Sequence, residues 1–272
     1  MGKTALITGA SRGIGRGIAL VLAEQGYDIA ITYNSKEEEA ALVCEQIEGM
    51  GVRAFYRQAS LQEEGVAEET VAWAVKKLGR LDAMVCNAGV TIHNNLFTLT
   101  EKEIDFGYSL DFRSYMLCAK LAAEDMRKNG AAGRIIFITS SRGSRVYPED
   151  PIYGGMKAGL NRACQSLALE YSGDGITINC VAPGNTAIRG DFSMEELTAH
   201  RMQRKIPIGR SGTPKEVGEM VAYLCGPFGG YITGANIRLD GGLILPVMPL
   251  DAPPEMGRSW GKIPPHLAEK EK

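Results

Sequence analysis

A tyrosine and a lysine four residues apart, Tyr153 and Lys157, could act together as an acid–base pair. In a helix this spacing places both side chains on one face. A free tyrosine has a pKa of about 10, which is too high for a base at neutral pH. A nearby ammonium lowers the pKa of a phenol because it stabilises the phenolate, and this creates a usable proton donor and acceptor. Such pairs also occur by chance on helix surfaces, so the interpretation depends on the rest of the chain.

A second candidate site is a glycine-rich turn near the N-terminus. The sequence TGASRGIG at 8–15 follows a short apolar run and precedes an amphipathic helical pattern. Glycines there permit a tight turn and let backbone N–H groups approach a pyrophosphate at the helix N-terminus. This context predicts dinucleotide binding, and a purely structural turn is the alternative. The residues expected to contact the dinucleotide here are Gly9, Ser11, Arg12, Gly13, Ile14 and Gly15.

The end of the second apolar run bears on the choice between NAD(H) and NADP(H). An acidic residue there would bind the adenosine ribose hydroxyls and select NAD. The run instead continues without a carboxylate until Glu37, while Arg12 can supply a cation for a 2′-phosphate. We therefore expect NADP(H) to be preferred, with NAD(H) possible; the alternative is that Arg12 and Lys36 are ordinary surface charges. The residues expected around this ribose are Tyr33, Asn34 and Ser35.

Both candidate sites need a scaffold, and the apolar pattern predicts one. Short apolar runs alternate with longer helical patterns, and continuous apolar runs suit strands that are buried on both faces of a parallel sheet. The alternation predicts an α/β fold, a single-domain Rossmann-type doubly wound parallel sheet of about seven strands with helices on both faces. The expected strands are 4–8, 28–33, 52–56, 83–86, 134–139, 176–181 and 236–239. The expected helices are 13–25, 36–49, 63–79, 100–129, 152–172 and 214–225.

Composition is consistent with one such domain. The chain has 272 residues, is 44% hydrophobic and 23% charged, and carries a net charge of −2. This charge gives no general reason to expect binding to nucleic acid or to an anionic membrane. The six cysteines lack CxxC spacing and the three histidines lack ligand spacing, so we expect a reducing cytoplasm and no metal site. No signal peptide or membrane span is indicated.

The C-terminal segment differs in composition from the rest of the chain. Six of the twelve prolines follow Gly242, and the chain then ends in alternating charges. We expect a domain over residues 1–243 and a Pro-rich C-terminal tail over residues 244–272. An extended segment of this kind can pack across a neighbouring subunit or over a pocket mouth.

Taken together, the motifs over about residues 3–243 resemble the short-chain dehydrogenase/reductase family. Besides the glycine turn, they comprise an Asn-Ala-Gly turn, a serine thirteen residues before the tyrosine, a Pro-Gly pair and a terminal motif. The residues of these further motifs are Asn87, Ala88, Gly89, Ser140, Tyr153, Lys157, Pro183, Gly184, Tyr231, Gly234, Asp240, Gly241 and Gly242. The resemblance implies an oxidoreductase that acts on CH–OH groups and transfers hydride between a nicotinamide and a secondary alcohol or its ketone.

The resemblance also implies roles for particular residues. Tyr153 would be the general acid/base, Lys157 would assist it and bind the nicotinamide ribose, and Ser140 would hold the substrate oxygen. Similar motifs occur in 3-oxoacyl-thioester reductases and in sugar or polyol dehydrogenases, and most family members are homotetramers. The cofactor contacts implied beyond the glycine turn come from Asn87, Ala88, Gly89, Tyr153, Lys157, Pro183, Gly184, Thr186 and Ile188.

Three positions depart from the family pattern. Asp111 stands where many members have an asparagine that completes a catalytic tetrad, and we expect activity with a shifted pH profile. The aspartate that usually meets the adenine is replaced near residues 58–60. Ile188 stands where threonine is common, which leaves Thr186 or backbone groups to bind the carboxamide. Asp111 also keeps open an alternative function, that of a catalytically impaired nucleotide-sensing or scaffold protein.

The substrate pocket is expected to form after Gly89 and from the segments 141–149 and 185–206. A polar pocket would suit a sugar or polyol better than a sterol. Basic residues that often dock a carrier protein are replaced by Ala131, Ala132 and Asp174, which counts against a carrier-bound substrate. The candidate polar side chains are His93, Asn94, Arg142, Arg145, Tyr147, Glu149, Asn185 and Arg189.

Overall fold

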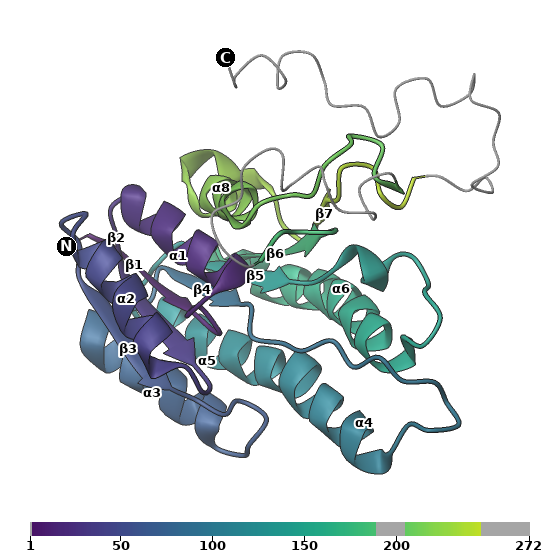
Figure 1. Ribbon diagram of the computed structural model, residues 1–272. Coiled ribbons are helices and arrows are strands. Elements are labelled where there is room, and N and C mark those ends of the chain that lie inside the picture. Colours follow the sequence, from purple (N-terminus) through teal and green to yellow (C-terminus); the bar gives the residue numbers. More distant parts are fainter. Residues whose placement is uncertain (1, 189–204, 246–272) are drawn as a thin grey trace.

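Seven strands form one parallel sheet in the computed structural model, which describes residues 2–188 and 205–245 (Figure 1). The strand order is β3-β2-β1-β4-β5-β6-β7. The predicted doubly wound α/β fold is confirmed; β4 and β7 have the predicted bounds, and the other strands differ by one or two residues at an end. The strands are β1 Lys3–Ile7, β2 Tyr27–Tyr33, β3 Ala54–Gln58, β4 Ala83–Cys86, β5 Arg134–Ile138, β6 Thr177–Pro183 and β7 Asn236–Leu239.

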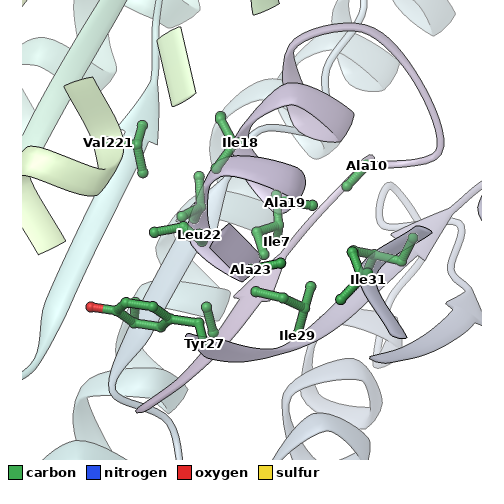
Figure 2. Packing of buried hydrophobic residues seen from close by; sticks show 14 of the residues in the cluster. Ile7, Ala10, Ile18, Ala19, Leu22, Ala23, Tyr27, Ile29, Ile31 and Val221 are labelled. Atoms are coloured by element: carbon green, nitrogen blue, oxygen red, sulfur yellow. The ribbon is translucent and has the colours of Figure 1, made fainter. Parts of the chain in front are cut away.

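Helices cover both faces of this sheet, as Figure 1 shows. One face carries α1 Gly13–Glu24, α2 Glu37–Glu48 and α8 Pro214–Cys225. The opposite face carries α3 Val66–Leu78, α5 Ser114–Lys128 and α6 Pro151–Tyr171. Figure 2 shows the first face, where Ile18 and Leu22 of α1 lie in one buried cluster with Ile29 of β2 and Val221 of α8. Burial on both sides explains why the central strands are continuous apolar runs, whereas the edge strands β3 and β7 contain exposed polar residues.

The segment that the sequence pattern predicts as one helix over 100–129 contains a change of helical type. It consists of α4 Glu101–Tyr108, a π-helical turn Ser109–Arg113, and then α5. Such wide turns often lie at functional sites, and this one contains the buried Asp111. The apolar pattern did not reveal the turn, because one wider turn alters the helical period only locally.

The strand ends define where a ligand could bind. From β1 the chain adds strands outward on one side of the sheet, β2 and then β3, and from β4 onward it adds strands on the other side. Where the strand order reverses in this way, between β1 and β4, a crevice forms at the carboxyl ends of the strands. Ile7 of β1 lies opposite Ile31 of β2 and Val85 of β4. The segments that follow these three strands therefore meet at one edge of the sheet.

The cysteines, the possible membrane spans and the C-terminal tail were also the subject of predictions from the sequence. All six cysteines are free and buried. Within residues 2–188 and 205–245, no helix has the length and apolar character needed to cross a membrane. The predicted tail over 244–272 lies outside the described residues beyond Leu245, as does Arg189 of the expected pocket.

Candidate active site

A cleft of about 560 Å³ lies at the carboxyl edge of the sheet. It joins the glycine turn after β1 to the strand ends and to the first turns of α6. The predicted site residues that line it are Gly9, Ser11, Arg12, Gly13, Ile14, Gly15, Tyr33, Asn34, Ser35, Asn87, Ala88, Gly89, Ser140, Tyr153, Lys157, Pro183, Gly184 and Ile188. The structure thus brings the predicted nucleotide-binding and catalytic residues into a single cleft.

Two predicted site residues do not line the cleft. Thr186 forms a β-bridge with Gly212 and is not among the lining residues, and its predicted cofactor contact stays a prediction. Asp111 instead touches Lys157 inside the protein. Several other lining residues were not predicted as site residues, although some of them lie at or near the end of an expected strand and could have been found from that position. These residues are Thr32, Ala59, Leu61, Gln62, Phe106, Leu110, Ile138 and Thr139, whereas Lys36, Val90 and Thr91 lie in segments already expected near the cofactor or the substrate.

The glycine turn is held in shape by hydrogen bonds from neighbouring strand ends. The amide N–H of Gly9 donates to Thr32 Oγ1 at 2.9 Å. Asn87 Nδ2 donates to the carbonyl oxygens of Thr8 and Gly9, both at 2.9 Å. Gly9 has a φ of 65°, and a Cβ on Gly15 would collide with the Gly9 carbonyl oxygen. The turn therefore requires both glycines, and its backbone remains open to a ligand.

The end of the cleft near β2 carries positive charge. Arg12 and Lys36 line it, and none of the described lining residues is an aspartate or glutamate. Asn34 is fixed in place, since its carbonyl oxygen accepts from Gln58 Nε2 at 2.7 Å and its Oδ1 accepts from Ser60 Oγ at 3.2 Å. Gln58 and Ser60 thus hold Asn34 in the cleft wall. The positive charge of Arg12 and Lys36 at this end is suited to a ligand that carries an anionic group there.

The opposite end holds the predicted catalytic residues. Ser140 follows β5, is 8% exposed, and its Oγ accepts from the Arg142 amide at 3.2 Å. Asp150 caps α6 by accepting from the Gly154 amide, which fixes the first turns of the helix that carries Tyr153 and Lys157. Lys157 Nζ lies 5.5 Å from the centre of the Tyr153 ring. The ammonium is thus near enough to act on the phenol electrostatically.

Lys157 is nearly buried and has three close partners. Its Nζ donates to the Tyr115 hydroxyl at 3.1 Å and to the Ile138 carbonyl oxygen at 3.2 Å. It also lies 3.1 Å from Asp111 Oδ1, and the two side chains of this ion pair are 3% and 1% exposed. The other Asp111 oxygen accepts from the Val90 amide at 3.2 Å. One carboxyl oxygen of Asp111 therefore accepts a backbone hydrogen bond, and the other lies beside the Lys157 ammonium.

Burial and charge act in opposite directions on this pair. Burial alone would lower the pKa of Lys157, but Tyr115, Asp111 and Tyr153 together raise it above its ordinary value. Burial raises the pKa of the Asp111 carboxyl, and the Lys157 ammonium opposes that increase. These partners therefore favour the ammonium form of Lys157, which lines the cleft.

The wall beyond the catalytic residues is mainly apolar. Val90, Thr91, Phe106 and Leu110 line it. None of the predicted polar pocket residues is among the described lining residues, although the Arg142 guanidinium lies 5.6 Å from the centre of the Tyr153 ring.

Several of those polar groups are engaged elsewhere. Asn94 Nδ2 donates to the Thr98 carbonyl oxygen, and Asn185 Nδ2 donates to Ser211 Oγ at 2.9 Å. Arg142 Nε donates to Asp150 Oδ2 at 2.8 Å. These side chains hold loops in place, and such pairing could not be seen in the sequence.

The fold and cleft define the class as a dinucleotide-binding α/β protein with a serine, a tyrosine and a lysine in the same cleft as its glycine turn. Comparison with known proteins agrees. A family model described as Enoyl-(Acyl carrier protein) reductase matches residues 9–244. The 3-oxoacyl-[acyl-carrier-protein] reductase FabG of Staphylococcus aureus is 35% identical over 245 residues, which cover 90% of this chain and 99% of that protein.

Solved structures give the same result. The acetoin dehydrogenase YohF of Salmonella typhimurium is 33% identical with a TM-score of 0.84, covering 90% of this chain and 98% of its own. The acetoin dehydrogenase of Enterobacter cloacae is 32% identical with a TM-score of 0.85, covering 93% and 99%. The chain belongs to the short-chain dehydrogenase/reductase family and is an oxidoreductase that acts on CH–OH groups. Members of this family use NAD(H) or NADP(H).

Proposed function

We propose that this protein transfers hydride between NADP(H) and a secondary alcohol or its ketone, with Tyr153 as the general acid/base. The observation that carries the proposal is that Ser140, Tyr153 and Lys157 line the same cleft as the glycine turn. The family implies such a trio, and the geometry places Lys157 Nζ near the phenol ring.

The residues of the cleft have complementary tasks in this reaction. When bound, the nicotinamide supplies or accepts the hydride. During reduction, Ser140 holds the substrate oxygen while Tyr153 gives that oxygen its proton; oxidation returns the proton to Tyr153. The Lys157 ammonium stabilises the phenolate that remains. The carbonyl carbon gains the hydride and the oxygen gains the proton, so the step is balanced.

The cleft fits NADP(H) on two counts. The turn at Gly9 and Gly15 leaves backbone open where side chains would otherwise stand, which suits a pyrophosphate. Arg12 and Lys36 can meet a 2′-phosphate, and the described lining has no carboxylate to repel one. These features support NADP(H) over NAD(H).

The apolar wall supports a substrate with an aliphatic flank. Phe106 and Leu110 offer little hydrogen bonding to a sugar or polyol. The names of the relatives refer to 3-oxoacyl and acetoin chemistry, and both are ketone compounds with carbon chains. We therefore place a short aliphatic ketone or a 3-oxoacyl thioester ahead of a sugar.

Steady-state kinetics with NADPH test this proposal. The substrate panel comprises acetoin, acetoacetyl-CoA and a ketose, with NADPH consumption followed at 340 nm. Loss of the acid/base hydroxyl in Tyr153→Phe should lower kcat about 10²- to 10⁴-fold. Tyr223→Phe, a half-exposed tyrosine on α8, is the control and should keep activity. Unchanged turnover in Tyr153→Phe would contradict the proposed role.

The Asp111–Lys157 pair favours a second candidate, a protein that binds nucleotide without turnover, because a carboxylate partly neutralises the ammonium. NADPH binding without activity on the panel, together with activity in Asp111→Asn, would support this candidate.

We also propose that the protein is a homotetramer, which is supported by exposed apolar side chains such as Tyr108 on α4 and Leu169 on α6. Light scattering of the purified protein measures that state.

A further inference from the structure

Tyr115 on α5 is a buried tyrosine that the sequence motifs did not identify. It is 1% exposed, and its ring packs against Phe137 of β5 with 5.6 Å between ring centres. Its hydroxyl donates to the Ile138 carbonyl oxygen at 3.2 Å and accepts from Lys157 Nζ at 3.1 Å. Tyr115 on the buried face of α5 thus places its hydroxyl beside the Lys157 ammonium.

The contacts of Lys157 differ in what they determine. An ammonium has three donors, and two of them are directed to the Tyr115 hydroxyl and the Ile138 carbonyl oxygen. Asp111 Oδ1 is close, yet it has no hydrogen bond of acceptable geometry to any described residue. Asp111 therefore contributes mainly charge, whereas Tyr115 and Ile138 determine where the ammonium points.

We propose that Tyr115 is a positioning residue whose hydroxyl holds the Lys157 ammonium at the floor of the cleft beside Tyr153. The inference rests on the proposed function, since it assigns Lys157 a task at the cofactor. A lysine side chain has many rotamers, and holding it in one has an entropic cost. Tyr115 meets this need because ring packing and the Ile138 carbonyl already fix its hydroxyl. Without that oxygen, the ammonium can shift toward Asp111 and away from the cleft.

A structural role without influence on Lys157 is the competing explanation, because any buried hydroxyl needs a partner. Tyr27 supplies the matched case in the same molecule. It is 4% exposed, and its hydroxyl donates to the Cys225 carbonyl oxygen at 3.0 Å. Tyr27 does not line the cleft. Tyr27→Phe therefore removes the same chemical group from a comparable environment remote from Lys157.

The first test needs no cofactor. Tyr115→Phe and Tyr27→Phe are each made in the wild-type chain and in Lys157→Met, and urea unfolding midpoints are measured. The midpoint shift caused by Tyr115→Phe should shrink by about half or more in Lys157→Met, because the hydroxyl has lost its charged partner. The shift caused by Tyr27→Phe should be the same in both backgrounds. Equal shifts for Tyr115→Phe in both backgrounds overturn the proposal.

The second test measures position at the cofactor. Calorimetric titration compares NADPH with adenosine 2′,5′-bisphosphate, which lacks the nicotinamide half. Tyr115→Phe should weaken NADPH binding about 3- to 10-fold and leave the fragment within about 2-fold, as expected for one hydrogen bond to a charged group. It should also lower kcat, whereas Tyr27→Phe should change none of these quantities. Identical binding and kcat in the two variants would show that Tyr115 is only structural.

The two tests separate the inference from the proposed function. If wild-type protein binds no NADPH or turns over no ketone, the proposed function fails. The unfolding cycle then still decides whether Tyr115 holds Lys157. Coupling in that cycle without an effect on NADPH affinity contradicts the positioning role at the cofactor.

Discussion

Replacing Lys157 by methionine should destabilise the fold mainly because it leaves the Asp111 carboxylate alone in the interior. The two charged atoms are 3.1 Å apart, and their side chains are 3% and 1% exposed. At an effective dielectric constant of about 20, two unit charges at this distance attract by roughly 5 kcal/mol. Loss of one partner of a buried pair typically costs about 3–5 kcal/mol. We expect Lys157→Met to lose unfolding free energy in that range near neutral pH.

The loss should depend on pH in a defined direction. Burial already raises the pKa of Asp111, and removing Lys157 takes away the charge that opposes this effect. A group whose pKa is higher in the folded state contributes stability below its unfolded pKa, here about 4, and that contribution is lost as pH rises through the folded pKa. The deficit of Lys157→Met should therefore be smallest near pH 4 and grow toward pH 8.

Urea unfolding at several pH values between 4 and 8 tests both parts of this prediction. The double variant Lys157→Met/Asp111→Asn leaves no unpaired carboxylate at position 111, so it should recover most of the loss of unfolding free energy and show no added pH dependence. Lys120→Met is the control, because Lys120 and Glu124 form an exposed ion pair whose side chains are 62% and 56% exposed. Its loss should change the unfolding free energy by less than about 0.5 kcal/mol. The reasoning would be refuted if Lys157→Met lost less than about 1 kcal/mol of unfolding free energy at pH 8, or if the double variant were no more stable than Lys157→Met alone.

Three further predictions concern the cofactor and the assembly. Arg12→Ala should weaken NADPH binding about 10-fold or more while changing NADH binding far less, as measured by fluorescence titration; equal losses would exclude a 2′-phosphate contact. Gly15→Ala should weaken both cofactors, because its Cβ would meet the Gly9 carbonyl oxygen and the Asn87 amide; full affinity for both would contradict the need for close packing there. Light scattering should give a tetramer mass, and a monomer at micromolar concentration would remove that expectation.

The sequence by itself determined the features that depend on local pattern. The continuous apolar run at 83–86 predicted β4 with its observed bounds, since strands buried on both faces must be apolar throughout. The edge strand β7 also has its predicted bounds, although Asn236 and Arg238 in it are exposed. The glycine turn was equally readable because its short-range geometry tolerates few alternatives. The spacing of Ser140, Tyr153 and Lys157 matched a family pattern, and all three line the cleft.

The tertiary structure decided which groups meet across large distances in the chain. Tyr115 reaches Lys157 over 42 residues of sequence, and no periodicity records that contact. Thr186 forms a β-bridge with Gly212, 26 residues further along the chain, which the sequence pattern did not reveal. Asn94 and Asn185, which the sequence offered as pocket residues, hydrogen-bond Thr98 and Ser211 and are not among the described lining residues. The sequence gives the type of each side chain, but the partner of that side chain depends on which elements pack together in the fold. In this protein the packing of α5 and β5 against α6 determined the surroundings of Lys157.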